Sequence, residues 1–128
     1  MVKTPAEKWK DTVIYYKKKC QKIIQVSKSV RYAGVINVYG RTLTGIVRSD
    51  EKPLLKSEQI KNEFFILSTL MNLRKDAANS VGKLNYVLLE HQKIFILIFQ
   101  KNNMTFYVSI DRKEKNINSI ISKLKKII

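Results

Sequence analysis

The side chains that could catalyse a reaction or bind a metal are few and far apart in this sequence. His91 is the only histidine and Cys20 the only cysteine, so the chain lacks the clustered ligands of a zinc or iron-sulfur site. Asp50 and Glu51 form the one adjacent carboxylate pair, followed by Lys52. General acid-base catalysis needs two groups in contrasting environments, which a solvated pair does not provide. We therefore expect no enzyme activity, no metal and no cofactor.

The abundant lysine side chains could bind anions. The 128 residues carry 25 Lys and Arg against 10 Asp and Glu, a net charge of +15. Residues 1–31 account for +7 and residues 112–128 for +5, so the excess lies at the two ends. Tyr15 and Tyr16 directly precede three lysines, which sets phosphate-binding cations beside possible stacking rings.

This charge leaves several partners open. A nucleic acid, an anionic membrane surface or an acidic protein would suit it, and a solvated lysine-rich face is the simplest interpretation. The candidate residues for an anionic partner are Lys10, Lys17, Lys18, Lys19, Lys123, Lys125 and Lys126.

The sequence predicts a cytoplasmic protein of one domain. Its longest apolar run, Ile94–Phe99, is too short to cross a bilayer, and the first five residues do not resemble a signal peptide. We expect one domain over residues 1–128, with a basic N-terminal helix over 1–29 and a core over 30–128.

The first predicted element is a helix from Thr4-Pro5-Ala6-Glu7, which has the form of a capping box with proline at the first helical position, to about Ser27. Its apolar stripe has helical spacing and comprises Trp9, Val13, Tyr16, Cys20 and Ile23 or Ile24. Cys20 on this stripe is best interpreted as a small buried hydrophobe; the alternative is a reactive thiol, if it is exposed to the neighbouring lysines.

The remaining elements follow from turns and periodicity. Residues 32–38 and 43–47 predict a β-hairpin, and a second helix is expected from Ser57 to Val81, ending at Gly82. Three strands are expected over 84–90, 93–100 and 104–110. Asp111 to Glu114 could form a capping box for a last helix. The predicted order is αββαβββα, an α+β fold.

This order resembles the Roadblock/LC7 group, itself similar to longin and profilin-like domains, and also small uncharacterised archaeal proteins of this architecture. The most specific likeness lies in residues 34–44, where Gly34, Asn37 and Gly40 match the glycine, the Asp or Asn, and the turn glycine of the group. Tyr39 stands where an acidic residue is more usual.

The resemblance implies a five-stranded antiparallel sheet in order 2-1-5-4-3, with the middle helix on one face and the terminal helices on the other. It also implies a non-enzymatic dimer, formed through the third strand and the middle helix. Such a protein would be a scaffold or regulator of a small Ras-like GTPase or a related regulatory complex. A nucleic-acid-binding domain that uses the terminal helices is the alternative function.

The second predicted helix has an apolar sector of roughly 180°, wider than the roughly 100° of an ordinary surface helix. The surplus fits a helix that covers a sheet and also dimerises. Glu63 and Arg74 fall inside this sector, eleven residues apart, too far to pair within one helix. We expect Glu63 to meet Arg74 of a second subunit and Leu67 to meet Leu70; the alternative is that both charged side chains reach solvent at the ends of the sector.

Phe65 is the expected contact for a protein partner. By helical spacing it stands away from the apolar sector, among polar residues of the same helix. Isolated exposure of one aromatic side chain is the alternative explanation. The sequence does not indicate who the partner is, nor whether the dimer contains one kind of chain or two.

Overall fold

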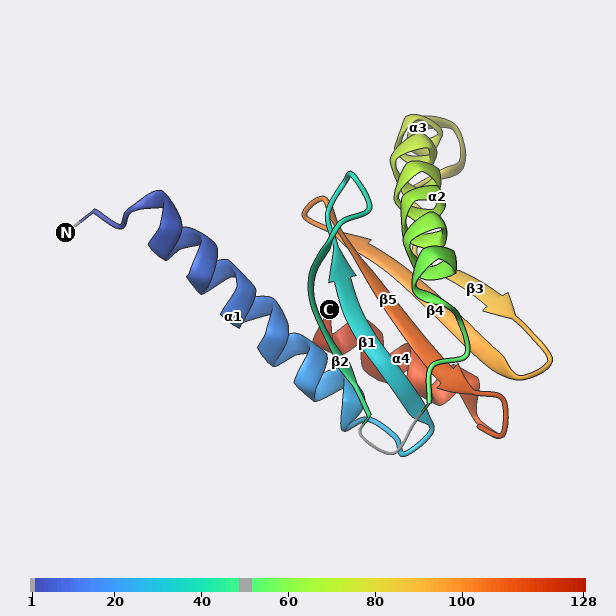
Figure 1. The fold of residues 1–128 in the computed structure, drawn as a ribbon. Coiled ribbons are helices and arrows are strands. Elements are labelled where there is room, and N and C mark those ends of the chain that lie inside the picture. The colour runs from blue at the N-terminus through green and yellow to red at the C-terminus, as the bar shows by residue number, and fades with distance from the viewer. Residues whose placement is uncertain (1, 49–51) are drawn as a thin grey trace.

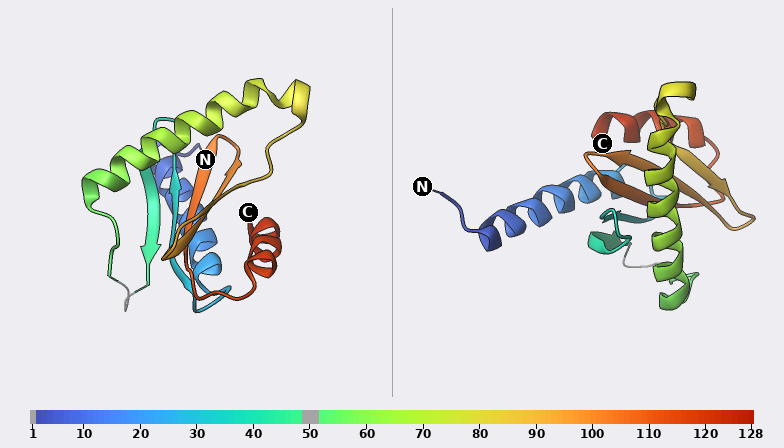
Figure 2. Two further views of the ribbon diagram at one scale, coloured as in Figure 1. Left: turned by 90° about the vertical axis from the view of Figure 1, so that its right-hand side faces the viewer. Right: turned by 90° about the horizontal axis from the view of Figure 1, so that it is seen from above.

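A five-stranded antiparallel sheet separates two layers of helices in the computed structural model, which describes residues 2–48 and 52–128 (Figure 1). The elements in chain order are α1 (Pro5–Ile24), β1 (Val30–Ile36), β2 (Thr42–Val47), α2 (Ser57–Asp76), α3 (Ala78–Val81), β3 (Val87–Glu90), β4 (Ile94–Lys101), β5 (Met104–Asp111) and α4 (Ile117–Ile127). The strand order is β2-β1-β5-β4-β3. Helix α2 covers one face, and α1 and α4 lie on the other (Figure 2). The predicted α+β class, strand order and helix placement are confirmed.

Strand β4 shows how the sheet builds two cores. Ile94, Ile96 and Ile98 point toward α2, whereas Phe95, Leu97 and Phe99 point toward α1 and α4. A strand covered on both faces is apolar without alternation, as the sequence predicted. The core under α2 contains Ile36, Phe64, Leu67, Met71, Ile94, Ile96, Ile98 and Tyr107.

Helix α1 begins as predicted but packs over only part of its length. The Thr4 hydroxyl accepts the Glu7 amide at 3.2 Å, and the Glu7 carboxylate accepts the Thr4 amide at 3.3 Å. Tyr16, Cys20 and Ile23 are buried, but Trp9 on the same stripe is 59% exposed. The helix runs past the β2 edge of the sheet, so its first half has no strand beneath it (Figure 1). Trp9 therefore continues the predicted apolar stripe without being buried.

Several other boundaries differ from the predicted ones; β1, for example, spans Val30–Ile36 rather than residues 32–38. The expected second helix is interrupted at Ala77 and continues as the short α3, which ends at Gly82 with φ +86°. Helix α1 ends at Ile24, before Ser27, and β3 starts at Val87.

Helix α4 does not start with the predicted capping box. Asn116 is the N-cap, and its Oδ1 accepts the Ser119 amide at 3.1 Å. Glu114 links the connection between β5 and α4 to the connection between α1 and β1. Its carboxylate accepts hydrogen bonds from the hydroxyls of Ser29 at 2.7 Å and Ser27 at 3.0 Å, and from the Asn116 amide at 3.0 Å. The Ser29 bond, followed by the Asn116 bond, lowers the pKa of Glu114 below its usual value.

We predict that Glu114→Gln destabilises the protein at neutral pH but not in acid. A carboxylate with a depressed pKa in the folded state stabilises the fold above its unfolded pKa, about 4.5, and this contribution is lost as the pH falls through the folded value. The free energy of unfolding should fall by about 0.5–1 kcal/mol at pH 7, since the site is partly solvated. Urea unfolding at pH 7 and pH 3 measures the difference. Glu90→Gln, which removes an exposed ion pair to Arg112, is the control with little effect at either pH; an equal loss for Glu114→Gln at both pH values would refute the explanation.

Candidate functional site: the outer surface of α2

His91 and Cys20, the side chains considered for metal binding and thiol chemistry, lie in different surroundings. His91 is exposed in the turn between β3 and β4, and no three His, Cys, Asp or Glu side chains within 2–48 and 52–128 gather as metal ligands. Cys20 is fully buried, and burial raises the pKa of its thiol to about 11. The thiol is therefore protonated and shielded, which confirms its interpretation as a buried hydrophobe. Asp50 and Glu51 lie outside the described residues.

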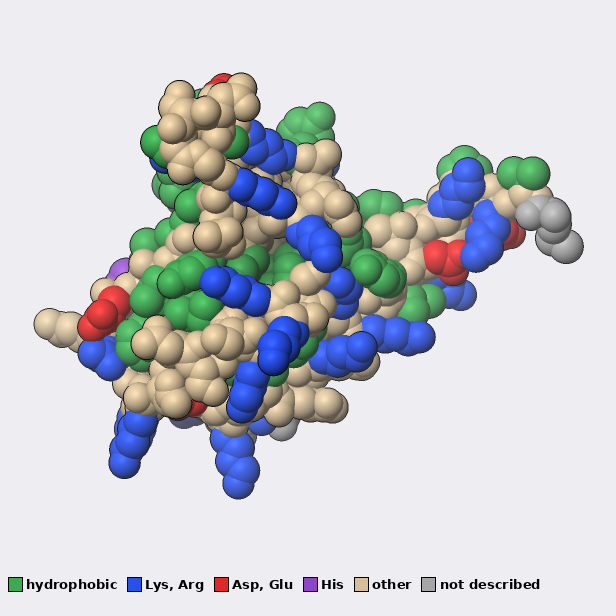
Figure 3. Space-filling view, turned by 180° about the vertical axis from the view of Figure 1, so that it is seen from behind, with side chains coloured by type: hydrophobic (Ala, Val, Ile, Leu, Met, Phe, Trp, Pro, Cys, Tyr) green, Lys and Arg blue, Asp and Glu red, His purple; other side chains and the backbone are tan. Residues whose placement is uncertain are grey.

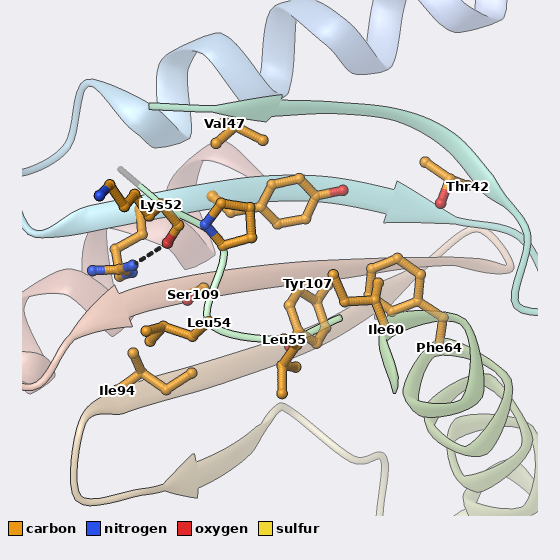
Figure 4. Close-up of a pocket in the computed structure, with 13 residues that line it drawn as sticks. Thr42, Val47, Lys52, Leu54, Leu55, Ile60, Phe64, Ile94, Tyr107 and Ser109 are labelled. Atoms are coloured by element: carbon orange, nitrogen blue, oxygen red, sulfur yellow. Dashed lines mark hydrogen bonds between the residues drawn. The ribbon is translucent and has the colours of Figure 1, made fainter. Parts of the chain in front are cut away.

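An apolar cavity of about 260 Å³ lies between the sheet and the connector that leads into α2. Figure 4 shows Leu54 and Leu55 of the connector facing Ile94 and Tyr107 of the sheet, with Phe64 of α2 at one end. Arg31 and Lys52 are the charged residues among its lining, and Arg31 Nη2 donates to the Lys52 carbonyl at 2.9 Å. The rest of the lining that the structure describes is uncharged and mostly apolar.

The outward surface of α2 is more apolar than is usual for a helix whose outer side faces only water. Ile66 is 62%, Leu70 38% and Leu73 63% exposed. Their spacing of four and three residues places them in one row along the helix. We call Ile66, Leu70 and Leu73 the α2 row. Large apolar side chains exposed in a contiguous row indicate a contact surface.

The α2 row lies on the flank of the helix that faces the β3 edge. The opposite flank carries Phe65 and Asn72 and meets the turn between β1 and β2: Asn72 Nδ2 donates to the Val38 carbonyl at 3.2 Å. The row is on the other side, toward β3, the edge strand of the sheet. Exposed apolar side chains and an open strand edge are therefore neighbours, as they are in a surface that pairs with another sheet.

The four predicted interface residues are placed differently. Leu70 and Arg74 are exposed on α2. Leu67 is only 5% exposed and packs in the core against the sheet, so its predicted place in an interface was wrong; the wide apolar sector contained both the core side and the exposed row. Glu63 is half-buried and accepts a hydrogen bond from Tyr107 Oη at 3.0 Å, and its pairing with Arg74 of a second subunit stays a prediction.

The residues behind the Roadblock/LC7 resemblance shape the turn that docks on α2. Asn37 Oδ1 accepts the amides of Tyr39 at 2.9 Å and Arg41 at 3.0 Å. Gly40 has φ +79°, and a Cβ at this position would come within 2.7 Å of Phe65 Cα. Asparagine thus closes the turn, and glycine lets it approach the backbone of α2.

Phe65 borders a groove formed by this turn and α2. Phe65 is 61% and Tyr39 74% exposed, and both line the groove, whose volume is about 640 Å³. Arg41 and Lys61 add positive charge to its lining. The predicted exposure of Phe65 is confirmed, whereas Tyr39 was not considered as a site residue. Its presence where relatives more often have an acidic residue is the signal that could have indicated it.

The predicted lysines belong to α1 and α4, the two helices on the other face of the sheet. Helices α1 and α4 meet there, since Lys19 Nζ donates to the carbonyl oxygens of Ile127 at 3.3 Å and Ile128 at 3.2 Å. Figure 3 shows basic side chains spread over this side, with acidic ones near its margins. None of the helices in the described ranges combines the length and apolar character needed to cross a bilayer.

Comparisons with known proteins agree on the fold. The sequence matches no protein-family model and no curated protein. Among solved structures, the chain is similar to the gliding protein MglB of Thermus thermophilus, with a TM-score of 0.66, 8% identity, and 87% of this chain and 83% of that chain covered. MglB of Myxococcus xanthus gives 0.63 at 9% identity, covering 86% and 88%. A Roadblock/LC7 domain of Streptomyces avermitilis gives 0.60 at 13% identity, covering 85% and 90%. The chain therefore has the Roadblock/LC7 fold.

Proposed function

We propose that this protein is a non-enzymatic dimeric scaffold that binds a protein partner through the outer surface of α2. The observation that carries the proposal is the α2 row of Ile66, Leu70 and Leu73 beside the open edge of β3. In an isolated chain this row would leave three large apolar side chains in water, next to unpaired backbone groups. Pairing two copies about a two-fold axis covers both features at once.

The dimer uses two contacts that reinforce each other. Strand β3 pairs with β3 of the second copy and extends the sheet, while the two α2 helices pack through their rows. The row of each copy meets the row of the other, since an isologous interface presents the same surface twice. Arg74 is exposed one residue after Leu73, and in this dimer it would reach across the axis to Glu63 of the second copy.

The protein partner binds beside the dimer contact, at the groove of Phe65 and Tyr39. Two exposed aromatic side chains next to Arg41 and Lys61 fit a surface that combines apolar and acidic groups. By its resemblance to the Roadblock/LC7 group, the partner class is a small Ras-like GTPase. The groove and the α2 row lie on opposite flanks of α2, so one protomer can hold a partner without opening the dimer.

We predict that Phe65→Ala weakens partner binding at least about tenfold, because exposed aromatic side chains at a contact supply much of its binding energy. Immobilised protein is incubated with host lysate that contains either GDP or a non-hydrolysable GTP analogue, and captured proteins are identified by mass spectrometry. A small GTPase retained with one nucleotide, and lost with Phe65→Ala, is the expected result. Tyr15→Ala, at a 54% exposed aromatic residue on the other side of the sheet, is the control. Recovery of no nucleotide-binding protein would contradict the proposed partner class.

A further inference from the structure

We propose that the surface formed by α1 and α4 binds single-stranded nucleic acid, with Tyr15 stacking on a base and lysines of both helices contacting phosphates. This surface lies on the face of the sheet opposite α2, so it goes beyond the proposed scaffold function and does not depend on the dimer. Affinity of this kind combines an electrostatic attraction to the backbone with aromatic platforms for the bases. The chain has both parts, in contact with each other.

The two helices form one continuous surface. Lys19 of α1 donates hydrogen bonds to the carbonyl oxygens of Ile127 and Ile128 at the end of α4. Lys101, the last residue of β4, also donates from Nζ to the Ile128 carbonyl, at 2.8 Å. Lys19 and Lys101 therefore hold the C-terminal end of α4 in place. Their charges stay at the junction, where they add to the positive potential without being the groups that reach a ligand.

Tyr15 is an exposed ring in a fixed position beside this junction. Its ring meets the ring of Tyr16 edge-on, with centroids 5.0 Å apart and an interplanar angle of 80°. Tyr16 is 9% exposed and belongs to the core, whereas Tyr15 is 54% exposed. Lys19 Nζ lies 5.2 Å from the centroid of the Tyr15 ring. A ring that is held on two sides, and open on more than half its surface, loses little freedom when a base stacks on it.

The free lysines have the spacing to flank a strand that passes over Tyr15. Lys18 and Lys22 follow Tyr15 by three and seven residues, so they share its side of α1. On α4, Lys123 and Lys126 are exposed three residues apart, while Ile120, Ile121 and Leu124 of the same helix are buried. Lys10 and Lys17 lie on the other flank of α1 by the same spacing.

Little negative charge opposes these lysines. The acidic residues of α1 are Glu7, which closes the N-terminal capping box, and Asp11, which is paired with Lys3. Both lie toward the start of the helix, away from Lys18 and Lys22. Figure 3 shows the corresponding surface, with acidic side chains confined to its margins. The field over the junction of α1 and α4 is therefore positive, which attracts a polyanion.

The exposed ring of Tyr15 at the junction of the two helices favours single strands over a duplex or a membrane. Bases in a duplex are already stacked on each other and present no free face to Tyr15, whereas bases of a single strand do. A membrane-bound helix presents a row of apolar side chains on its outward face. The exposed residues of α4 are instead polar or basic: Asn118, Ser122, Lys123, Lys125 and Lys126. Ile14 beside Tyr15 is 42% exposed, so it can contact a base that stacks on the ring.

The test is fluorescence anisotropy with a labelled oligonucleotide of twenty thymidines and the full-length protein at about 50 mM salt. Binding should weaken as salt rises, with a slope of about −3 in log affinity against log salt for four lysine-phosphate contacts. Tyr15→Ala should lower the affinity about tenfold, while Tyr15→Phe, which keeps the stacking ring, should leave it nearly unchanged. Tyr39→Ala, an exposed aromatic residue on the other side of the molecule, should have no effect.

Two charge variants locate the site. Lys18→Glu with Lys22→Glu and Lys10→Glu with Lys17→Glu change the net charge equally, but only the first pair adjoins Tyr15. We expect the first variant to lose at least about tenfold more affinity than the second. Equal losses, unchanged binding by Tyr15→Ala, or preference for a twenty-base-pair duplex would overturn the proposal. So would absence of binding at 100 µM protein, or retention only by vesicles that contain phosphatidylserine. Circular dichroism confirms that each variant is folded.

Discussion

Ile66→Asp should convert the dimer into monomers. The substitution sets a carboxylate in the α2 row, where the second copy would bury it among apolar side chains. An unpaired charge in an apolar contact costs several kcal/mol, so we expect the dissociation constant of the dimer to rise at least about 100-fold. Sedimentation velocity over a concentration series measures this rise, and circular dichroism should show an unchanged fold, because Ile66 is 62% exposed within one chain.

The adjacent residue is a matched control. Phe65 is 61% exposed, nearly the same as Ile66, but it lies on the opposite flank of α2. Phe65→Asp should leave the dimer intact and abolish partner capture. Ile66→Asp should dissociate the dimer. If both variants, or neither, dissociate the dimer, then the assignment of the two flanks of α2 is wrong.

Gly40→Ala should lower the free energy of unfolding by about 3 kcal/mol. An alanine at φ +79° carries about 1–2 kcal/mol of backbone strain. Its Cβ would also lie 2.7 Å from Phe65 Cα and 2.9 Å from Phe65 N, and no side-chain rotation relieves a clash with backbone. The turn between β1 and β2 must therefore move away from α2, with loss of the Asn72 bond to Val38. Urea unfolding followed by circular dichroism provides the measurement.

Gly82→Ala is the control that measures the cost of positive φ without a steric clash. Gly82 also has positive φ, at +86°, but a Cβ there would meet no atom within 4 Å. It follows the short, exposed α3, whose last turn can relax, so we expect a loss of about 1 kcal/mol. A loss for Gly40→Ala no larger than that for Gly82→Ala would show that the contact between the turn and α2 does not constrain residue 40.

Features governed by neighbouring residues could be predicted from the sequence. The Thr4 capping box and the glycine end at Gly82 depend on chemistry within one turn of chain, and both are present. The strand order came from the Roadblock/LC7 resemblance, whose residues Asn37 and Gly40 make the predicted turn. Unbroken apolar residues predicted β4 as a central strand because both of its faces are covered.

Features governed by the reach of the sheet could not be predicted. Trp9 continues the stripe of Tyr16 and Cys20, and only the position of the β2 edge shows that nothing lies beneath it. Periodicity likewise placed Leu67 and Leu70 in one apolar sector, although the sheet buries one and leaves the other exposed. The predicted capping box started the last helix at Asp111, but Glu114 of that box is bound by the serines of the distant α1–β1 connection, and Asn116 caps α4 instead.

Only the part of the candidate site that lies within one helix could be predicted from the sequence. Apolar width predicted that α2 has an exposed apolar side, and isolation among polar neighbours predicted the exposure of Phe65. The partner of Phe65 in the groove, Tyr39, lies 26 positions earlier in the chain, and their proximity depends on the turn at Gly40. Single-element periodicity carries no information on such a contact.

The most direct test of the scaffold dimer is the mass of the purified protein in solution. Size-exclusion chromatography with multi-angle light scattering, at loading concentrations from about 10 to 300 µM and 150 mM salt, should give twice the chain mass of 14.9 kDa. Ile66→Asp under the same conditions should give 14.9 kDa. A wild-type protein that remains at the single-chain mass up to the highest concentration would contradict the account.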